Sequence, residues 1–357
     1  MRLSARLFQY AFLLLLTIAA IVVVLDVVYG TQSSWWVYLI KAFSPLLCIV
    51  FCGITAIRIA IPKLRMGRLE TLVALVIFVA LCAPTARHIR TRYPQASRLI
   101  SPRIEESFIS IVDLNVLGDR YLSDQSIAQI TKANADVVTL QEVNPELAAS
   151  AQQRLAKLYP CQILIPAEGT SGMGLLSRFS CRQIRDAIDG DWIGPPIVAE
   201  ISPPNRRPFI VANIHALAPH MPTPAEGQEN ILSRLSRTVR SREESLENLL
   251  RLLAGFEDRA VIIAGDLNAT IRNRAYALIR NNAYKDGWLT LHDQTNGGTW
   301  PFPEFFGTRL LSWILRIDYI FYSDLLSPVC GETIASDMGS DHKGLFFVFR
   351  ELSEVHS

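Results

Sequence analysis

The sequence lacks the features that mark strongly biased protein classes. Its 357 residues carry a formal net charge of only +2 at pH 7, so charge alone gives no argument for a nucleic-acid or acidic partner. Its six cysteines are scattered without metal-ligand spacing, and neither an internal repeat nor a low-complexity tract is visible. What remains is a chain long enough for one large domain plus a second, smaller part.

Apolar residues, by contrast, are abundant: they make up 50% of the chain and concentrate near its N-terminus. Residues 7–25 and 39–57 are apolar all round and long enough to cross a bilayer as helices, and 69–83 is a shorter third run. We therefore expect a membrane region of about three transmembrane helices over residues 1–86. A juxtamembrane linker over residues 87–105 follows it.

The distribution of Lys and Arg predicts the orientation of these helices. Arg2 and Arg6 precede the first run, and four basic residues lie between the second run and the third. The positive-inside rule then puts the N-terminus in the cytoplasm. Three spans leave the C-terminal part outside, which for a bacterial inner membrane means the periplasm. Four arginines between residues 87 and 98 favour the opposite orientation, although long domains translocate largely regardless of charge.

Beyond residue 105, short clusters of acidic, amide and histidine residues border apolar, strand-like runs. The six clusters are Asp113-Leu114-Asn115, Gln141-Glu142, Asn213-Ile214-His215, Gly265-Asp266-Leu267-Asn268, Arg316-Ile317-Asp318-Tyr319 and Ser340-Asp341-His342. A strand end places a side chain at the rim of a sheet, where it is rigid and accessible to solvent. Six such rims would bring together carboxylates, amides and imidazoles that suit one hard metal ion and a phosphate.

In their order along the chain, the six clusters resemble the motifs of the endonuclease/exonuclease/phosphatase superfamily, whose members include DNase I, exonuclease III and the neutral sphingomyelinases. The resemblance covers residues 106–350 and leaves 351–357 as a tail. It implies an α/β (α+β) four-layer sandwich of the DNase I type, in which two packed mixed β-sheets are flanked by helices. With the transmembrane helical segment in front, it predicts a membrane-anchored bacterial member of this superfamily.

The resemblance also implies which side chains hold the metal and which act on the water. Glu142 is the principal metal ligand, with Asn115 beside it and Asp341 as a second carboxylate near an Mg²⁺ ion, or Mn²⁺ as an alternative. Asp266 positions or deprotonates the attacking water, and Asn268 contacts the phosphate.

Two histidines are expected to take different roles. Asp318 should pair with His342 and favour its charged form, which then stabilises negative charge on the phosphate oxygens. His215 is the expected general acid for the leaving group, and the alternative is a rim residue that only forms hydrogen bonds. Asn213 and Arg178 are the expected substrate-binding or supporting residues, although a structural charge is an equally good interpretation of Arg178.

The predicted function is metal-dependent hydrolysis of a phosphoester, most simply a nucleic-acid phosphodiester attacked in line by water. A lipid phosphodiesterase or phosphatase acting at the anchoring bilayer is one alternative, since superfamily members act on DNA, RNA and lipids. A non-catalytic membrane scaffold is another, but no catalytic position is missing. The expected partners are the phosphoester substrate and the bilayer, and no protein partner is implied.

Two features leave alternatives open. Cys161 and Cys181 flank a predicted hairpin, and they either form a disulfide in a periplasmic domain or remain free thiols. The aromatic residues between Trp300 and Phe306 either stack on a base, dip into the membrane surface or pack inside the domain.

Overall fold

The computed structural model describes residue 14 and residues 108–117, 123–185, 187–219, 231–292, 297–300, 315–334 and 340–352. The predicted membrane region, apart from Leu14, the linker and most of the tail therefore lie outside the described residues. Within the described part of the chain, no helix is both long and apolar enough to cross a membrane. The transmembrane helices and their orientation stay predictions.

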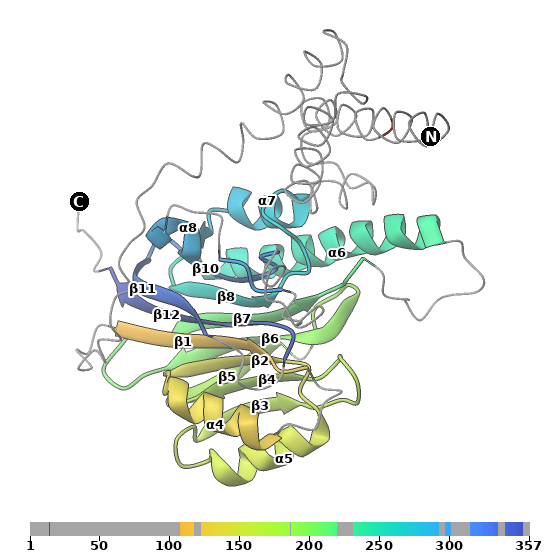
Figure 1. Cartoon of the computed structure of the whole chain (residues 1–357). Helices are drawn as coiled ribbons and strands as arrows, with labels where there is room; N and C mark the ends of the chain where they lie inside the picture. The colour runs from red at the N-terminus through yellow and green to blue at the C-terminus, as the bar shows by residue number, and fades with distance from the viewer. Residues whose placement is uncertain are drawn as a thin grey trace, which may run out of the picture. The chain divides into compact units, whose positions relative to one another are not determined.

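The helices and strands follow one another as a mixed series along the catalytic part of the chain (Figure 1). The described strands are β1 (Phe108–Asn115), β2 (Val137–Gln141), β3 (Cys161–Ile165), β4 (Met173–Ser177), β5 (Ser180–Arg185), β6 (Trp192–Ser202), β7 (Phe209–Ala216), β8 (Val261–Asp266), β9 (Lys285–Asp286), β10 (Asp318–Tyr322), β11 (Leu326–Ile334) and β12 (Gly344–Glu351). The described helices are α4 (Ser123–Ala133), α5 (Pro145–Arg154), α6 (Ile231–Leu253), α7 (Arg274–Asn281) and α8 (Gly287–His292), with the 3₁₀ turn η2 (Ala254–Phe256).

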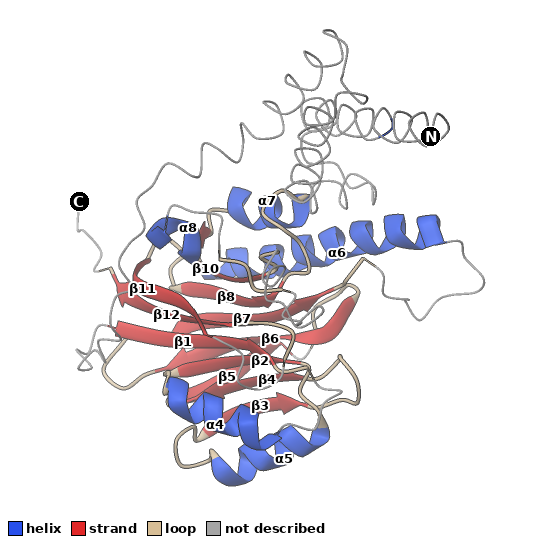
Figure 2. Cartoon of the chain, in the orientation of Figure 1, coloured by secondary structure: helices blue, strands red, loops and turns tan. Residues whose placement is uncertain are grey.

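The strands form two six-stranded mixed sheets (Figure 2). Sheet A has the order β11-β12-β1-β2-β4-β3, and sheet B has the order β5-β6-β7-β8-β10-β9. Each sheet has one parallel pair at its centre, β1 with β2 and β7 with β8, while the other neighbours are antiparallel. The two sheets therefore repeat the same central arrangement.

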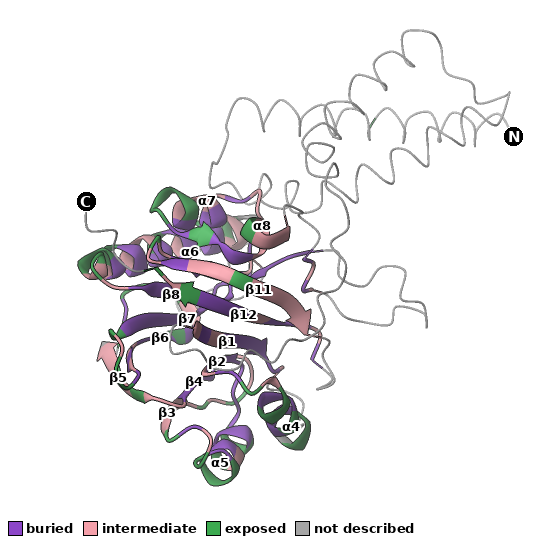
Figure 3. Ribbon diagram, turned by 90° about the vertical axis from the view of Figure 1, so that its left-hand side faces the viewer, coloured by how far each residue is buried: buried purple, intermediate pink, exposed green. Residues whose placement is uncertain are grey.

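Alternating apolar residues pack the sheets on both faces. Ile111 of β1 and Val211 of β7 belong to the core between the two sheets, whereas Val112 and Leu114 pack towards α4 and α5. This alternation buries both faces of the central strands (Figure 3). Helices α4 and α5 lie beside sheet A, and α6 and α7 lie beside sheet B, while α8 contacts both β10 of sheet B and β11 of sheet A (Figure 1). The prediction of two mixed β-sheets flanked by helices is confirmed.

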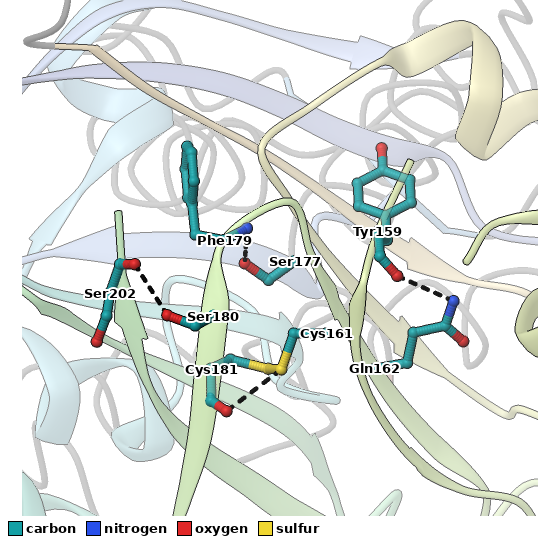
Figure 4. The surroundings of a disulfide bond; sticks show 8 residues. All are labelled: Tyr159, Cys161, Gln162, Ser177, Phe179, Ser180, Cys181 and Ser202. Atoms are coloured by element: carbon teal, nitrogen blue, oxygen red, sulfur yellow. Dashed lines mark hydrogen bonds between the residues drawn. A yellow bond between two sulfur atoms is a disulfide. The ribbon is translucent and has the colours of Figure 1, made fainter. Parts of the chain in front are cut away.

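A disulfide joins Cys161 on β3 to Cys181 on β5, with their Cα atoms 5.8 Å apart (Figure 4). β3 is one edge strand of sheet A and β5 is one edge strand of sheet B, so the bond links the two sheets at these edge strands. Of the two alternatives that the sequence leaves open, the structure has the disulfide.

Candidate active site at one edge of the sandwich

The carboxyl ends of the four central strands bring four predicted site residues to one edge of the sandwich. Asn115 ends β1, Glu142 follows β2, His215 lies near the end of β7 and Asp266 ends β8. Because β1 is parallel to β2 and β7 is parallel to β8, the last residues of each pair lie at the same end of its sheet. All four residues are buried.

Two further residues reach this edge from antiparallel strands. Asp318 opens β10 opposite Asp266 of β8. His342 lies just before β12, whose first residues pair with the last residues of β1. The Ser340 hydroxyl donates to the carbonyl of Asn115 (2.7 Å) and accepts the backbone N–H of His342 (3.0 Å). The turn before β12 is therefore fixed to the end of β1.

Short distances show that these side chains form one cluster. The Asn115 amide donates to Glu142 Oε1 (3.0 Å) and to Asp266 Oδ2 (3.4 Å). Nε2 of His215 lies 3.6 Å from Asp266 Oδ2 and 4.0 Å from Glu142 Oε1. The structure thus brings Glu142 and Asn115, predicted to hold a metal, together with Asp266, predicted to orient the water.

His342 and Asp318 form a hydrogen-bonded pair. Nδ1 of His342 lies 2.9 and 3.1 Å from the two Asp318 oxygens. Burial alone would lower the pKa of His342, but the charge and hydrogen bond of Asp318, with the charges of Asp266 and Asp341, raise it to about 10. His342 is therefore protonated at neutral pH, and its Nε2 lies 3.8 Å from Asp266 Oδ2 and 4.0 Å from Asp341 Oδ1.

Unlike His342, His215 is uncharged. Burial, and after it the charge of His342, lowers the pKa of His215 to about 3. A ring with this pKa is neutral near pH 7, which favours the hydrogen-bonding alternative for His215 over the role of general acid. The charged imidazole at this edge is His342, and the position of His215 between Glu142 and Asp266 fits the hydrogen-bonding alternative.

Asp266 lies in a site with an excess of buried negative charge. Burial, and then the charge of Asp318, raises the pKa of Asp266 well above its usual value, and Glu142 adds to this effect. The charge of His342 opposes the increase without cancelling it. A divalent cation such as Mg²⁺ prefers carboxylate and amide oxygens and would neutralise this excess.

Two sets of side chains compete as ligands for such a cation. Ligand atoms of Asp266, Asp318 and His342 all lie within 4.8 Å of one another. However, both oxygens of Asp318 face Nδ1 of His342, and a protonated imidazole has no lone pair to offer a metal. The carboxylates of Glu142 and Asp266 therefore fit the cation better, and the Asn115 amide holds both of them through its N–H groups.

Two predicted residues border the cluster. Asp341 is 38% exposed at its side chain and accepts the indole N–H of Trp300 (3.0 Å), which places this aromatic residue at the rim. Asn268 has a left-handed φ of 51°, donates its amide to the last carbonyl of β7 (3.0 Å) and donates its backbone N–H to Asp266 Oδ1 (2.8 Å). The rest of the aromatic segment up to Phe306 lies outside the described residues.

The structure does not bring the two predicted substrate-binding residues to the cluster. Asn213 is fully buried beneath it and donates its amide to the carbonyls of Leu140 (3.0 Å) and Gly174 (2.8 Å) in the other sheet. Arg178 follows β4, which runs antiparallel to β2 and therefore ends at the opposite edge, where its backbone N–H reaches the carbonyl of Asp136 (3.0 Å). The position of Arg178 therefore argues against substrate binding and favours the alternative, a structural charge.

Sequence reasoning missed Arg242, a buried arginine behind the cluster. It lies on α6, and its guanidinium donates to the carbonyls of Leu217 (3.1 Å) and Asn268 (2.7 Å), in the loops that follow β7 and β8. These bonds fix two loops that border the site. Its position three residues after Val239 and four before Leu246, on the apolar stripe of the helix, is the signal that identifies it as buried.

Residues 114–342, which include all six clusters apart from Asp113, match the model of the Endonuclease/Exonuclease/phosphatase family. The chain belongs to this family. Membership makes the protein an enzyme, a metal-dependent phosphoric ester hydrolase. The scaffold alternative is therefore set aside.

Solved structures show the same fold at low sequence identity. AP endonuclease LMAP from Leishmania major is 19% identical, with 75% of this chain and 99% of that one covered and a TM-score of 0.52. D. rerio TDP2, complexed with single strand DNA product, is 20% identical, with 68% and 99% covered and a TM-score of 0.51. An endonuclease/exonuclease/phosphatase from Bacteroides vulgatus is 17% identical, with 69% and 99% covered and a TM-score of 0.50. No curated protein sequence matches the chain.

Proposed function

We propose that the protein is a membrane-anchored, divalent-metal-dependent phosphodiesterase that cleaves nucleic acid by in-line attack of water. One observation carries the proposal: a carboxylate with a raised pKa, Asp266, faces a histidine that stays protonated, His342, at one buried edge. Oδ2 of the first lies 3.8 Å from Nε2 of the second. A base and a cationic group this close together suit the attack of water on phosphorus.

Asp266 orients the attacking water and accepts its proton. A general base works best when its pKa approaches the pH of the reaction, and burial moves the pKa of Asp266 in that direction. Its Oδ1 accepts the backbone N–H of Asn268 (2.8 Å), while Oδ2 faces Asn115 and His215. The carboxylate is therefore held in one orientation, with Oδ2 towards the reacting atoms.

His342 supplies positive charge where the phosphoryl oxygens become more negative. Asp318 holds Nδ1 of the ring, so Nε2–H is directed towards the space between Asp266 and Asp341. A charged donor fixed in advance stabilises the transition state without reorganisation. His215, being neutral, contributes a hydrogen bond at the same place.

Glu142, supported by Asn115 and Asp266, would hold the divalent cation, Mg²⁺ or in its place Mn²⁺, with Asp341 at the rim. When bound, the cation neutralises and orients the phosphoryl group. The left-handed backbone of Glu142, with φ of 63°, turns its side chain back over the strand end and towards Asn115.

The substrate class is proposed from similar folds. One similar structure is named an AP endonuclease, and another contains a single strand DNA product, which favours nucleic acid. A second candidate is a lipid phosphodiesterase, which the apolar runs over residues 1–86 favour because they would hold the enzyme at a bilayer. Both substrates present a phosphodiester to the same chemistry.

The location is also a proposal: an inner-membrane protein whose catalytic domain faces the periplasm. The disulfide between Cys161 and Cys181 supports it, because disulfides persist in oxidising compartments and are rare in the cytosol. Protease treatment of spheroplasts tests this orientation. We expect the domain to be digested without lysis, and protection until lysis would place it in the cytoplasm.

Full-length protein in detergent, assayed with Mg²⁺ and with chelator, tests the activity. We expect metal-dependent cleavage of single-stranded DNA that Asp266→Asn reduces by about 10²–10⁴-fold. Sphingomyelin and phosphatidylinositol vesicles form the lipid arm of the assay. Cleavage of the lipids alone would replace the nucleic-acid proposal with the lipid candidate, and hydrolysis that survives chelation would contradict the metal-dependent mechanism.

A further inference from the structure

A layer of polar side chains lies directly beneath the candidate site, between the two sheets. Asp113, Thr139, Gln141 and Asn213 are all buried, with at most 1% of their surface exposed. Asp113 occupies the same face of β1 as Ile111, which belongs to the apolar core between the sheets. The apolar layer thus gives way to polar groups just before the strands reach the site.

Hydrogen bonds join these side chains into one network. Thr139 Oγ1 and Gln141 Nε2 both donate to Asp113 Oδ1, at 2.6 and 2.8 Å. The same amide nitrogen of Gln141 donates to Asn213 Oδ1 across the sheet interface (2.7 Å). Gln141 is therefore clamped between a carboxylate of sheet A and an amide of sheet B.

The network also fixes the backbone that leads to the proposed metal ligand. Asn213 donates to the carbonyls of Leu140 on β2 and Gly174 on β4, so the residue before Gln141 is held as well. Glu142 follows immediately, with its left-handed φ of 63°. A non-glycine residue keeps this conformation only where its surroundings determine it, because the backbone is strained there.

We infer that Gln141, held by Asp113 and Asn213, is a positioning residue that fixes Glu142 for the divalent cation. The inference rests on the proposed function, in which Glu142 is the principal ligand. Gln141 acts through the backbone of its neighbour and through the strand end, and it does not touch the cation itself. Groups that hydrogen-bond directly to a metal ligand typically change metal affinity about 10- to 100-fold when they are replaced, and an effect near the lower end of that range is expected for Gln141, which acts through the backbone.

Binding of Mn²⁺, followed by the electron paramagnetic resonance of the free ion, tests this role without an activity assay. We expect Gln141→Met in the full-length protein to weaken Mn²⁺ binding by about tenfold or more. Gln162→Met is the matched control, because Gln162 Nε2 also makes two hydrogen bonds, to the carbonyls of Ala151 (3.2 Å) and Tyr159 (3.1 Å), away from the site. Both variants should lower Tm, but only Gln141→Met should lower the affinity.

Two further variants keep the outcome interpretable. Glu142→Gln should abolish the tight Mn²⁺ site; if it binds like the wild type, the assignment of Glu142 fails and the inference fails with it. If Glu142→Gln loses the site while Gln141→Met keeps wild-type affinity, the proposed function stands and the positioning role is overturned.

Thr139→Val serves if Gln141→Met does not fold, because it removes one donor to Asp113 at nearly constant shape. We expect weaker Mn²⁺ binding from this variant, and unchanged affinity would overturn the inference.

Discussion

The two ends of the central strands differ in how their polar groups are satisfied. At the carboxyl ends of β1, β2 and β8, Asn115, Glu142 and Asp266 crowd together, and the pKa of Asp266 is raised by burial and by neighbouring negative charge. At the amino end of β2, Asp136 accepts the backbone N–H of Ser110 (2.8 Å) and its hydroxyl (2.7 Å). One edge holds charge in excess, whereas the other satisfies its polar groups locally.

The opposite edge also carries the disulfide and the hydrogen bonds of Arg178. Cys161 pairs in register with Ser177, which pairs with Val137 at the start of β2, so the disulfide lies away from the cluster. Arg178 donates to both the carbonyl and the side chain of Asn134. An excess of buried charge thus marks the edge that carries the proposed chemistry, while locally satisfied hydrogen bonds and the disulfide mark the edge that holds the sheets together.

Asp266→Asn should give the largest effect on activity. We expect kcat/KM for single-stranded DNA to fall by about 10²–10⁴-fold, the usual contribution of a general base. The free energy of unfolding should not fall, since the change removes one of several mutually repelling buried carboxylates.

Asp136→Asn at the opposite edge is the matched control for that experiment. It should lower the free energy of unfolding, because the carboxylate accepts two hydrogen bonds from Ser110, and it should leave kcat/KM unchanged. If Asp136→Asn and Asp266→Asn reduced kcat/KM equally, the distinction between the two edges would fail.

Asp318→Asn should shift the pH profile of the enzyme. Asp318 is the main group that raises the pKa of His342 from 6.5 to about 10, so its neutral analogue should let that pKa fall by about 1–3 units. Since the reaction uses protonated His342, the basic limb of kcat/KM should move to lower pH. A basic limb that stays in place, measured from pH 6 to pH 10, would contradict this role.

Removal of the disulfide should affect stability alone. Cys161 and Cys181 close a loop with a sequence separation of 20, so replacing both with Ser should lower the free energy of unfolding by about 3 kcal/mol in the chain-entropy model. Urea unfolding of the double variant measures this loss, and kcat/KM below the midpoint should equal that of the wild type. A loss of activity in the folded variant would show that the two edges are coupled.

Much of the site edge is predictable from the sequence because each of its motifs borders a strand. Asn115, Glu142 and Asp266 follow apolar runs, and parallel pairing then brings them together. The charge state of His215 is not predictable in this way, because it depends on burial and on the charge of His342 in three dimensions.

Strand direction is a second property that the sequence does not determine. The end of a strand is visible in a sequence, but the direction of that strand in the sheet is not. Arg178 ends up at the opposite edge because β4 is antiparallel to β2. The strand β11 is also hard to recognise in the sequence, because Pro328 and Gly331 interrupt its apolar pattern. These residues are tolerated in a strand that lies at the edge of sheet A.

Arg178→Gln should have the smallest effect, and it tests most directly whether the two edges differ in function. The sequence motif suggests a substrate-binding arginine, whereas the structure places its half-buried side chain on Asn134 at the far edge. We expect KM and kcat for single-stranded DNA to stay at wild-type values, and the free energy of unfolding to fall by about 1 kcal/mol, the usual net contribution of one hydrogen bond. Arg182→Gln, which loses a contact to Glu200, is the matched control on the surface. A rise in KM for Arg178→Gln alone would mean that substrate extends to this edge, and the division of the sandwich into a chemical edge and a structural edge would have to be abandoned.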